Sequence, residues 1–218
     1  MDIATSVWEM AMHYNIGWLA NLLLTDTLDG LLEHFRDDYF TKAAGSGLSV
    51  FREMLDHIKI RATEEVAKAA AGNERSGKEV MMLLLKERGN EFEITEEVVK
   101  AAAGNGSSGK EVMMLLLEER GNEVEITEEV VKAAAGNTGS GKEVMMLLLE
   151  KQGNEIEITE EVLKAAAENY GSGKEVMMLL LEKQGNEIEI TEEVLKAAAE
   201  NEIYGKELMT LLNRRHPV

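Results

Sequence analysis

The stretch GKEVMMLLLEKQGNEIEITEEVLKAAAEN occupies residues 141–169 and recurs without change at residues 173–201. Its opening letters, GKEVMMLLL, also begin at residues 77 and 109, and a shorter form, GKELMTLL, begins at residue 205. Successive copies are 32 residues apart. A fixed period of this length indicates a repeat architecture, in which each unit packs against its neighbours.

Each copy predicts two short helices. The first spans about residues 78–88, and Gly89 after it is suited to a left-handed C-terminal cap. The second follows Thr95, a good N-cap residue, and has two glutamates in its first turn, where the helix dipole favours negative charge. Glu96 and Lys100 are spaced for an i,i+4 ion pair.

The apolar residues of these helices require neighbours on several sides. Each helix is too short to be stable alone. The VMMLLL run is apolar almost all round its helix, and the alanine triplet of the second helix allows close approach of another backbone. Stacked helix pairs bury such surfaces. The sequence therefore predicts an all-α fold, an α-solenoid of about seven stacked helix pairs.

The copies divide the chain into three parts. We expect divergent N-terminal capping repeats at residues 1–46, tandem repeats of 30–32 residues at 47–204 (starting at 47, 77, 109, 141 and 173), and a C-terminal capping helix at 205–218. In that last helix Thr210 replaces the second Met of earlier copies and Asn213 replaces the third Leu. These two positions share a helix face, so we predict that the second Met and third Leu of each copy pack on the following repeat. The N-terminal cap is expected to use the aromatic residues Trp8, Trp18, Phe35, Tyr39 and Phe40.

The copies resemble ankyrin repeats, in which a helix with an alanine core precedes a helix that ends in Leu-Leu-Leu and Gly. In the copy that begins at Thr159 the corresponding residues are Ala165, Ala166, Ala167, Leu179, Leu180, Leu181 and Gly185. The Thr-Pro-Leu-His start of ankyrin repeats is replaced by TEEV, and the hairpin finger is shortened to NEIEI. The copies are also similar to ankyrin-like repeats of fungal proteins, including NLR-type immune receptors. This resemblance implies an ankyrin-like solenoid that binds proteins and has no catalytic residues.

Composition restricts the class of partner. The 218-residue chain has a net charge of −18, which disfavours nucleic acid and anionic membrane surfaces and favours a basic protein partner. It has no cysteine, which excludes disulfides and thiolate metal sites. The N-terminal stretch is a poor signal peptide, and the apolar runs are too short to cross a membrane. We expect a cytoplasmic protein.

Three stretches nearly match the phosphate-binding P-loop. They are GNERSGKE, GNGSSGKE and GNTGSGKE, which begin at Gly72, Gly104 and Gly136. A P-loop follows a buried strand and has Ser or Thr after its Lys, whereas these stretches follow an alanine-rich helix and have Glu in that place. We interpret them as linkers in which glycine supplies a positive φ, and we reject a nucleotide site.

The sequence signals for other chemical sites, such as metal sites, are also weak. The acidic pair in FRDDYF, residues 35–40 without a nearby partner cluster, is more typical of a solvated helix face than of a magnesium site. The four histidines, His13, His34, His57 and His216, have no zinc-binding spacing. We expect core packing from the methionine pairs, no cofactor, no metal and no catalytic residue.

Partner-binding residues are sought where copies differ or where exposed charge recurs. The linker before each GK varies most, and it places Tyr170, Ile203 and Tyr204 as candidate exposed anchors. The alternative is that the linkers vary by neutral drift on an exposed surface. Two glutamate rows recur every 32 residues, Glu93, Glu125, Glu157 and Glu189, and Glu96, Glu128, Glu160 and Glu192. By analogy with ankyrin repeats these rows lie near a concave face and suit a basic protein segment.

The function that these patterns favour is a non-catalytic protein-recognition scaffold, for example a ligand-sensing array. The first alternative is a structural solenoid that self-associates, end to end or side by side, into a homo-oligomer. An enzyme and a designed consensus array are further alternatives.

Overall fold

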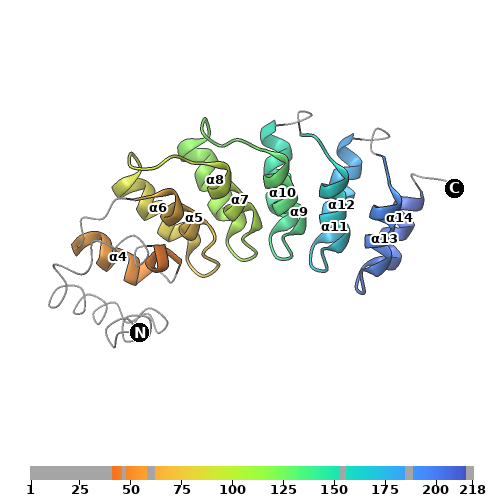
Figure 1. Cartoon of the computed structure of the whole chain (residues 1–218), viewed down its shortest axis with the longest axis horizontal. Coiled ribbons are helices and arrows are strands. Elements are labelled where there is room, and N and C mark those ends of the chain that lie inside the picture. The colour runs from red at the N-terminus through yellow and green to blue at the C-terminus, as the bar shows by residue number, and fades with distance from the viewer. Residues whose placement is uncertain (1–40, 46–47, 58–61, 153–155, 185–188, 215–218) are drawn as a thin grey trace.

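The computed structural model describes residues 41–45, 48–57, 62–152, 156–184 and 189–214. Every regular element in these ranges is an α-helix, and none of the described residues forms a strand. The helices stand side by side in chain order along an elongated array (Figure 1). The described part of the array begins with helical residues 41–45 and α4 (Leu48–His57). The predicted all-α class is confirmed.

Two kinds of helix alternate after α4. We name them from their sequences: TEE helices begin at the first Glu of a TEE motif, and GKE helices begin at the Gly of a GKE motif. The TEE helices are α5 (Glu64–Ala71), α7 (Glu96–Gly104), α9 (Glu128–Gly136), α11 (Glu160–Glu168) and α13 (Glu192–Glu200). The GKE helices are α6 (Gly77–Arg88), α8 (Gly109–Arg120), α10 (Gly141–Gln152), α12 (Gly173–Gln184) and α14 (Gly205–Asn213).

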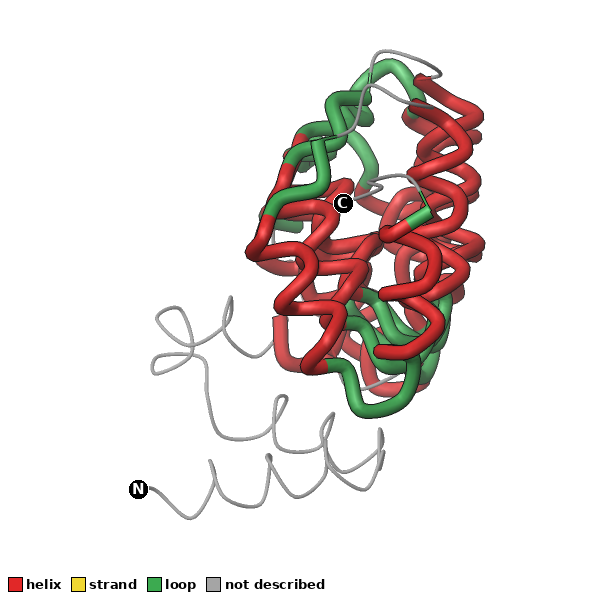
Figure 2. The backbone as a smooth tube through the Cα atoms, turned by 90° about the vertical axis from the view of Figure 1, so that its right-hand side faces the viewer, coloured by secondary structure: helices red, strands yellow, loops and turns green. Residues whose placement is uncertain are grey.

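These helices form two layers. Each TEE helix packs against the GKE helix that follows it, and each also contacts the TEE helices of the neighbouring repeats. The GKE helices contact one another in the same order and make the second layer. Figure 2, which looks along the array, shows the two layers of helices with loops at their ends. The predicted α-solenoid of stacked helix pairs is therefore confirmed.

The core lies between the layers and repeats with the sequence. In the central repeat the TEE helix contributes Val130, Val131 and the last two alanines of its triplet, and all four are buried. The following GKE helix contributes Val144 and Met145, both fully buried, along with its second leucine. The same positions are buried in the other repeats except the last, where Leu195 and Met209 are half-buried and Ala199 is exposed, so one continuous apolar core runs along the array. Burial of this kind is the main source of stability for helices this short.

The glycine that begins each GKE helix is required by close packing. A Cβ atom on Gly109 would lie 2.8 Å from the carbonyl oxygen of Ala102, and one on Gly173 would lie 2.3 Å from that of Ala166. The first turn of each GKE helix thus touches the last turn of the preceding TEE helix. A side chain at this position would push the two helices apart.

A buried asparagine shapes the linker loop between each TEE helix and its GKE helix. The Oδ1 atom of Asn137 accepts hydrogen bonds from the backbone N–H groups of Gly139 and Ser140, both at 3.0 Å. This is an Asx turn, in which the side chain takes the place of a backbone carbonyl. The equivalent residues Asn73, Asn105, Asn169 and Asn201 make the same pair of bonds.

The amide group of the same asparagine joins neighbouring repeats. The Nδ2 atom of Asn137 donates to the carbonyl oxygens of Ala103 (2.8 Å) and Asn105 (3.0 Å) in the preceding repeat. The hydroxyl of Ser140 also donates to the Asn105 carbonyl, at 2.8 Å. We call this chain of bonds, formed by Asn73, Asn105, Asn137, Asn169 and Asn201, the asparagine ladder. All five are buried, so the ladder fixes how one repeat sits on the next.

The predicted packing of the second methionine is wrong. Met82, Met114, Met146 and Met178 are 51%, 38%, 50% and 40% exposed, whereas the first methionine of each pair is fully buried. The VMMLLL run therefore has one solvent-facing position. Thr210 occupies that position in α14, so it does not mark a cap. Asn213 is different, because it stands where Leu181 is 1% exposed.

Three local predictions also need correction. Gly89 is right-handed, with φ −58°, and glycine is needed there because a Cβ atom would lie 2.3 Å from the Leu85 carbonyl oxygen. No described linker glycine has a positive φ either. Lys100 pairs with Glu97 at i,i+3 rather than with Glu96. The prediction of Thr95 as the N-cap residue is confirmed, although its side chain makes no capping hydrogen bond.

Several predictions fall outside the described residues. These include the aromatic N-terminal cap, the acidic pair of FRDDYF, and the side chains of all four histidines. Most of the predicted N-terminal part, residues 1–40, lies there as well.

Candidate functional site

The two predicted glutamate rows lie along one edge of the array. We name them together the acidic edge: Glu93, Glu96, Glu125, Glu128, Glu157, Glu160, Glu189 and Glu192. The structure brings these residues together, because each is in the segment that leads into a TEE helix or in its first turn, and these starts are side by side (Figure 1). All are exposed except Glu160, which is half-buried. Neighbouring helices pack about 8–10 Å apart, so the carboxylates recur at about that spacing.

Part of the acidic edge also holds the repeats together. The hydroxyl of Thr127 donates to Glu96 at 2.7 Å, and that of Thr159 donates to Glu128 at 2.6 Å. Each bond crosses from one repeat to the next, so this row has a structural role that the sequence did not reveal. Glu93 and Glu125 make no hydrogen bond or ion pair with the described residues, and their carboxylates remain available.

Lysines partly neutralise the same edge. Lys100 pairs with Glu97, and Lys164 pairs with Glu161 at 3.2 Å. The hydrogen bond from Lys100 lowers the pKa of Glu97 and raises the pKa of Lys100 in return. These pairs are solvent-exposed and add little stability.

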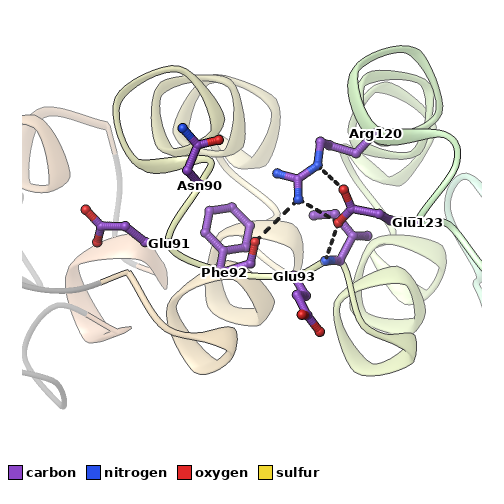
Figure 3. Close-up of a pocket in the computed structure, with 7 residues that line it drawn as sticks. Asn90, Glu91, Phe92, Glu93, Arg120 and Glu123 are labelled. Atoms are coloured by element: carbon purple, nitrogen blue, oxygen red, sulfur yellow. Dashed lines mark hydrogen bonds and ion pairs between the residues drawn. The ribbon is translucent and has the colours of Figure 1, made fainter.

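A polar hollow lies beside the acidic edge, between two connecting segments. Its volume is about 670 Å³, and its lining includes Asn90, Phe92, Glu93, Arg120 and Glu123 (Figure 3). Arg120 donates to the carbonyl oxygen of Gly89 at 2.7 Å and to Glu123 at 2.6 Å.

Glu123 is bound from two sides in this hollow. Besides the bond from Arg120, it accepts a hydrogen bond from the backbone N–H of Ile94 at 3.2 Å (Figure 3). The Arg120 hydrogen bond, followed by the Ile94 bond, lowers the pKa of Glu123 against the opposing effect of burial. Arg120 and Glu123 thus satisfy each other and connect adjacent repeats, whereas Glu93 makes no bond with the described residues. These groups form no base and nucleophile pair.

The predicted loop anchors lie at the opposite edge. Tyr170 and Ile203 are 63% and 58% exposed in the linker loops, at the far ends of the TEE helices from the acidic edge (Figure 1). Tyr204 is not an exposed anchor, because it is half-buried against the core and its hydroxyl donates to the Gly171 carbonyl oxygen at 3.1 Å. The acidic edge and the loop tyrosine therefore cannot belong to one small site.

A third surface was missed by the sequence reasoning. The exposed methionines Met82, Met114, Met146 and Met178, which we call the methionine ridge, occupy the same position on α6, α8, α10 and α12. These four helices are neighbours in the GKE layer, so the side chains form a row across it. A sequence signal for this exposure was present in α14, where the polar residue Thr210 occupies the position of the second Met.

An apolar groove adjoins the ridge between α6 and α8. It has a volume of about 430 Å³ and includes Met82, Leu85 and Leu115 in its lining, together with the charged residues Lys86, Glu119 and Arg120. The equivalent leucines further along, Leu149 and Leu181, are buried. Leu85 is only half-buried, which leaves apolar surface open in this part of the ridge.

The P-loop-like stretches contain the ends of TEE helices and the linker loops that follow them. Gly104 and Gly136 are the last residues of TEE helices, and a Cβ atom on either would meet nothing within 4 Å. The backbone N–H groups of Gly139 and Ser140 already donate to Asn137. Two of the loop amides that lie where a P-loop would cradle a phosphate are therefore occupied by this side chain.

Two further features are absent from the described residues. Within them there is no group of three or more His, Cys, Asp or Glu side chains that could hold a metal ion. None of the helices in this part of the chain is both long and apolar enough to span a membrane.

The stacked layers, the ladder and the exposed ridge define a tandem-repeat α-solenoid. Five successive segments, residues 56–81, 83–113, 115–145, 147–177 and 179–209, match the family described as Domain of unknown function (DUF7104), and the chain belongs to this family. No curated protein and no solved structure matches the chain.

Proposed function

We propose that this solenoid is a non-catalytic protein-recognition scaffold and that the methionine ridge is its principal binding surface. The supporting observation is the alignment of four large apolar side chains, each more than a third exposed, on neighbouring helices of one layer. Isolated exposed apolar residues are ordinary, but a contiguous apolar patch on a soluble protein marks an interaction site. Methionine is favoured at such surfaces because its flexible thioether adapts to different partners.

The groove between α6 and α8 provides a place for an anchoring side chain. Interfaces concentrate their binding energy in a few apolar or aromatic groups that fill such pockets. An apolar side chain in the groove would contact Met82, Leu85 and Leu115, with Lys86 and Glu119 nearby for polar contacts. The ridge and groove together suit a protein partner with an apolar contact surface.

The acidic edge supplies a second, electrostatic contribution. Its exposed carboxylates and the net charge of −18 favour a partner of positive charge and speed its approach. Because a chain in the polyproline II conformation has three residues per turn and advances about 3.1 Å per residue, a segment with a basic residue at every third position would present its charges on one side at the spacing of the row. The ankyrin-like character of the repeats agrees with this function, as does the sensing role of similar arrays in immune receptors. The lack of cysteine favours a cytoplasmic site of action.

Capture experiments with matched variants test the role of the ridge. Met114→Thr with Met146→Thr removes the centre of the ridge, and α14 shows that Thr is accepted at this position. Glu125→Gln with Glu157→Gln reduces the acidic edge by the same number of residues. We expect the ridge variant to lose partners that the wild-type protein captures, while its circular dichroism stays unchanged. We expect the acidic-edge variant to lose mainly contacts that salt also weakens. Equal capture by the wild-type protein and the ridge variant would contradict the proposal.

A further inference from the structure

The groove between α12 and α14 in the GKE layer is lined mainly by cations. It has a volume of about 290 Å³ and is lined by Lys174, Lys206, Glu207, Thr210, Leu211 and Arg214. We call it the cationic hollow. Three cations and one carboxylate give this lining a net charge of +2, in a chain whose overall net charge is −18. The hollow is therefore a local exception to the acidity of the chain.

The three cations of the hollow are not satisfied by the described part of the chain. The side chains of Lys174, Lys206 and Arg214 make no hydrogen bond or ion pair with a described residue. Arg120 in the polar hollow, in contrast, is paired with Glu123. Lys206 and Arg214 are exposed and Lys174 is half-buried. Their charged groups are thus available to a ligand that enters the cationic hollow.

Two substitutions distinguish α14 from the preceding GKE helices on this face. Thr210 occupies the position of the methionine ridge. Arg214 lies four residues later on the same helix face, where α6 has lysine and α8, α10 and α12 have glutamate. The counterparts Met178 and Glu182 are both exposed in α12, so core packing requires neither change. Together the two substitutions remove an apolar side chain and reverse a charge beside two lysines.

The residues of the hollow suit a group with several anionic oxygen atoms. Arginine presents a planar fork that binds carboxylate or phosphate through two parallel hydrogen bonds, and the lysines add point charges. The hydroxyl of Thr210 donates to the backbone carbonyl oxygen of Lys206 at 2.7 Å, so its contribution is a shorter side chain rather than a donor. Glu207 opposes an anion, but the cations outnumber it. Charges more than about 8 Å away are largely screened at physiological ionic strength, so a bound ligand interacts mainly with this lining.

We propose that the cationic hollow binds an acidic segment of a protein partner through the oxygen atoms of carboxylate or phosphorylated side chains. Its volume of about 290 Å³ is at the lower limit of small-molecule sites, which span about 300–1,000 Å³, and it suits a side chain better than a nucleotide. Thr210 continues the row of ridge methionines, so a partner that lies along the ridge would present its acidic residues at α14. The hollow does not depend on the ridge, because its cations would attract an acidic segment whether or not the ridge binds a partner.

The binding of two labelled peptides tests this site. The peptides have the same neutral sequence and a neutral fluorophore, and they carry either phosphoserine or glutamate at the same two positions. Fluorescence anisotropy during titration with the full chain should show saturable binding of at least one peptide, with a dissociation constant of about 0.1–1 mM, because ion pairs at an exposed site are weak. Added salt should weaken this binding. The peptide that binds more tightly identifies the anionic group, and equal affinities assign the site to both groups.

Charge reversal at two matched positions separates the hollow from the overall charge of the chain. Arg214→Glu introduces the residue that α12 has at this position and should raise the dissociation constant at least about tenfold. Lys110→Glu, at the exposed counterpart of Lys206 on α8, changes the net charge by the same amount and should raise it less than about twofold. The ridge variant Met114→Thr with Met146→Thr should bind the peptides as the wild-type protein does. Failure of the ridge and failure of the hollow are therefore distinguishable.

A gain of binding covers the case in which a charge-reversed variant is poorly folded. Met146→Thr with Glu150→Arg transfers the two substitutions to α10, beside Lys110 and Lys142. Isothermal titration calorimetry should then give two peptide sites per chain, whereas the wild-type protein should give one. The absence of saturable binding of either peptide to the wild-type protein at concentrations up to about 1 mM would overturn the proposal. Equal weakening by Arg214→Glu and Lys110→Glu, or the absence of a second site in the α10 variant, would overturn it as well.

Discussion

Removal of the central asparagine should weaken the whole array. Asn137 is buried, and its side chain makes five hydrogen bonds: Nδ2 donates to Ala103, Asn105 and Ser140, and Oδ1 accepts two bonds from the backbone of the linker loop. Each bond contributes about 0.5–1.5 kcal/mol net, and a buried group left without a partner costs more. Because the loop is at the edge of the array, water can reach some of these groups. We expect Asn137→Ala to lower the free energy of unfolding by about 3–5 kcal/mol.

Equilibrium denaturation followed by circular dichroism measures this loss. Thr138→Ala is the matched control, because Thr138 is the exposed neighbour in the same loop and its loss should cost under about 0.5 kcal/mol. Solenoid stability is a sum of repeat and interface terms, so a broken ladder should also broaden or split the transition. Asn73 makes three such bonds, and Asn73→Ala should cost less, about 2–3 kcal/mol.

The isosteric change Asn137→Asp adds a pH test. It places a carboxylate against the carbonyl oxygens of Ala103 and Asn105, where the wild-type amide donates. Protonation of the new carboxylate restores one hydrogen-bond donor. The difference in free energy of unfolding between the wild-type protein and this variant should therefore become smaller as the pH falls. An Asn137→Ala variant within about 0.5 kcal/mol of the wild-type protein would refute the claim that the ladder couples the repeats.

Other perturbations have distinct signatures. Gly136→Ala should stabilise the protein by about 0.5–1 kcal/mol, because the new Cβ meets open space at a helix end. Gly139→Ala should destabilise it, because its Cβ would lie 2.0 Å from the backbone of the preceding loop. Thermal denaturation compares the two variants, and equal shifts in their melting temperatures would contradict the loop packing. Thr159→Val removes both the hydroxyl bond to Glu128 and the helix-capping bond from the Val162 N–H, so it should cost about 1–2 kcal/mol, measured by urea denaturation. A double-mutant cycle with Glu128 that shows no coupling would contradict the bond between repeats. Glu123→Gln should cost under about 1 kcal/mol at neutral pH, because this carboxylate is more than a third exposed. Arg120 lowers the pKa of Glu123 in the folded protein, so the stabilisation from this carboxylate exists above the pKa of Glu123 in the unfolded chain and is lost as the pH falls through its folded-state pKa. Urea denaturation at about pH 7 and about pH 3 should therefore show a lower free energy of unfolding for Glu123→Gln than for the wild-type protein only at the higher pH.

The sequence was sufficient to predict the architecture because the same pattern of apolar and small residues recurs five times. Short helices, an apolar run and a small-residue triplet have few ways to bury their surface, and stacking is the one that a fixed period selects. The prediction failed at the level of single side chains. In VMMLLL every residue is apolar, so nothing in the run distinguishes Met81, which is fully buried, from Met82, which is 51% exposed.

The sequence revealed the position of the acidic edge but not the hydrogen bonds that join the repeats. The acidic edge was identified because charge at a fixed spacing is visible in sequence, but the bonds from Thr127 and Thr159 cross between repeats and required coordinates. The role of Asn137 was also missed, since an asparagine after an alanine-rich helix looks like an ordinary helix end. Only the stacked loops show that its amide reaches the preceding repeat.

Methionine oxidation mapped by peptide mass spectrometry tests the proposed recognition surface most directly. In the free protein, Met114 and Met146 should oxidise faster than their buried neighbours Met113 and Met145, which serve as internal controls. Once a partner has been obtained by capture, its addition should protect Met114 and Met146 and leave the buried pair unchanged. Equal oxidation of both members of each pair in the free protein, or full oxidation of Met114 and Met146 in the complex, would contradict recognition through the methionine ridge.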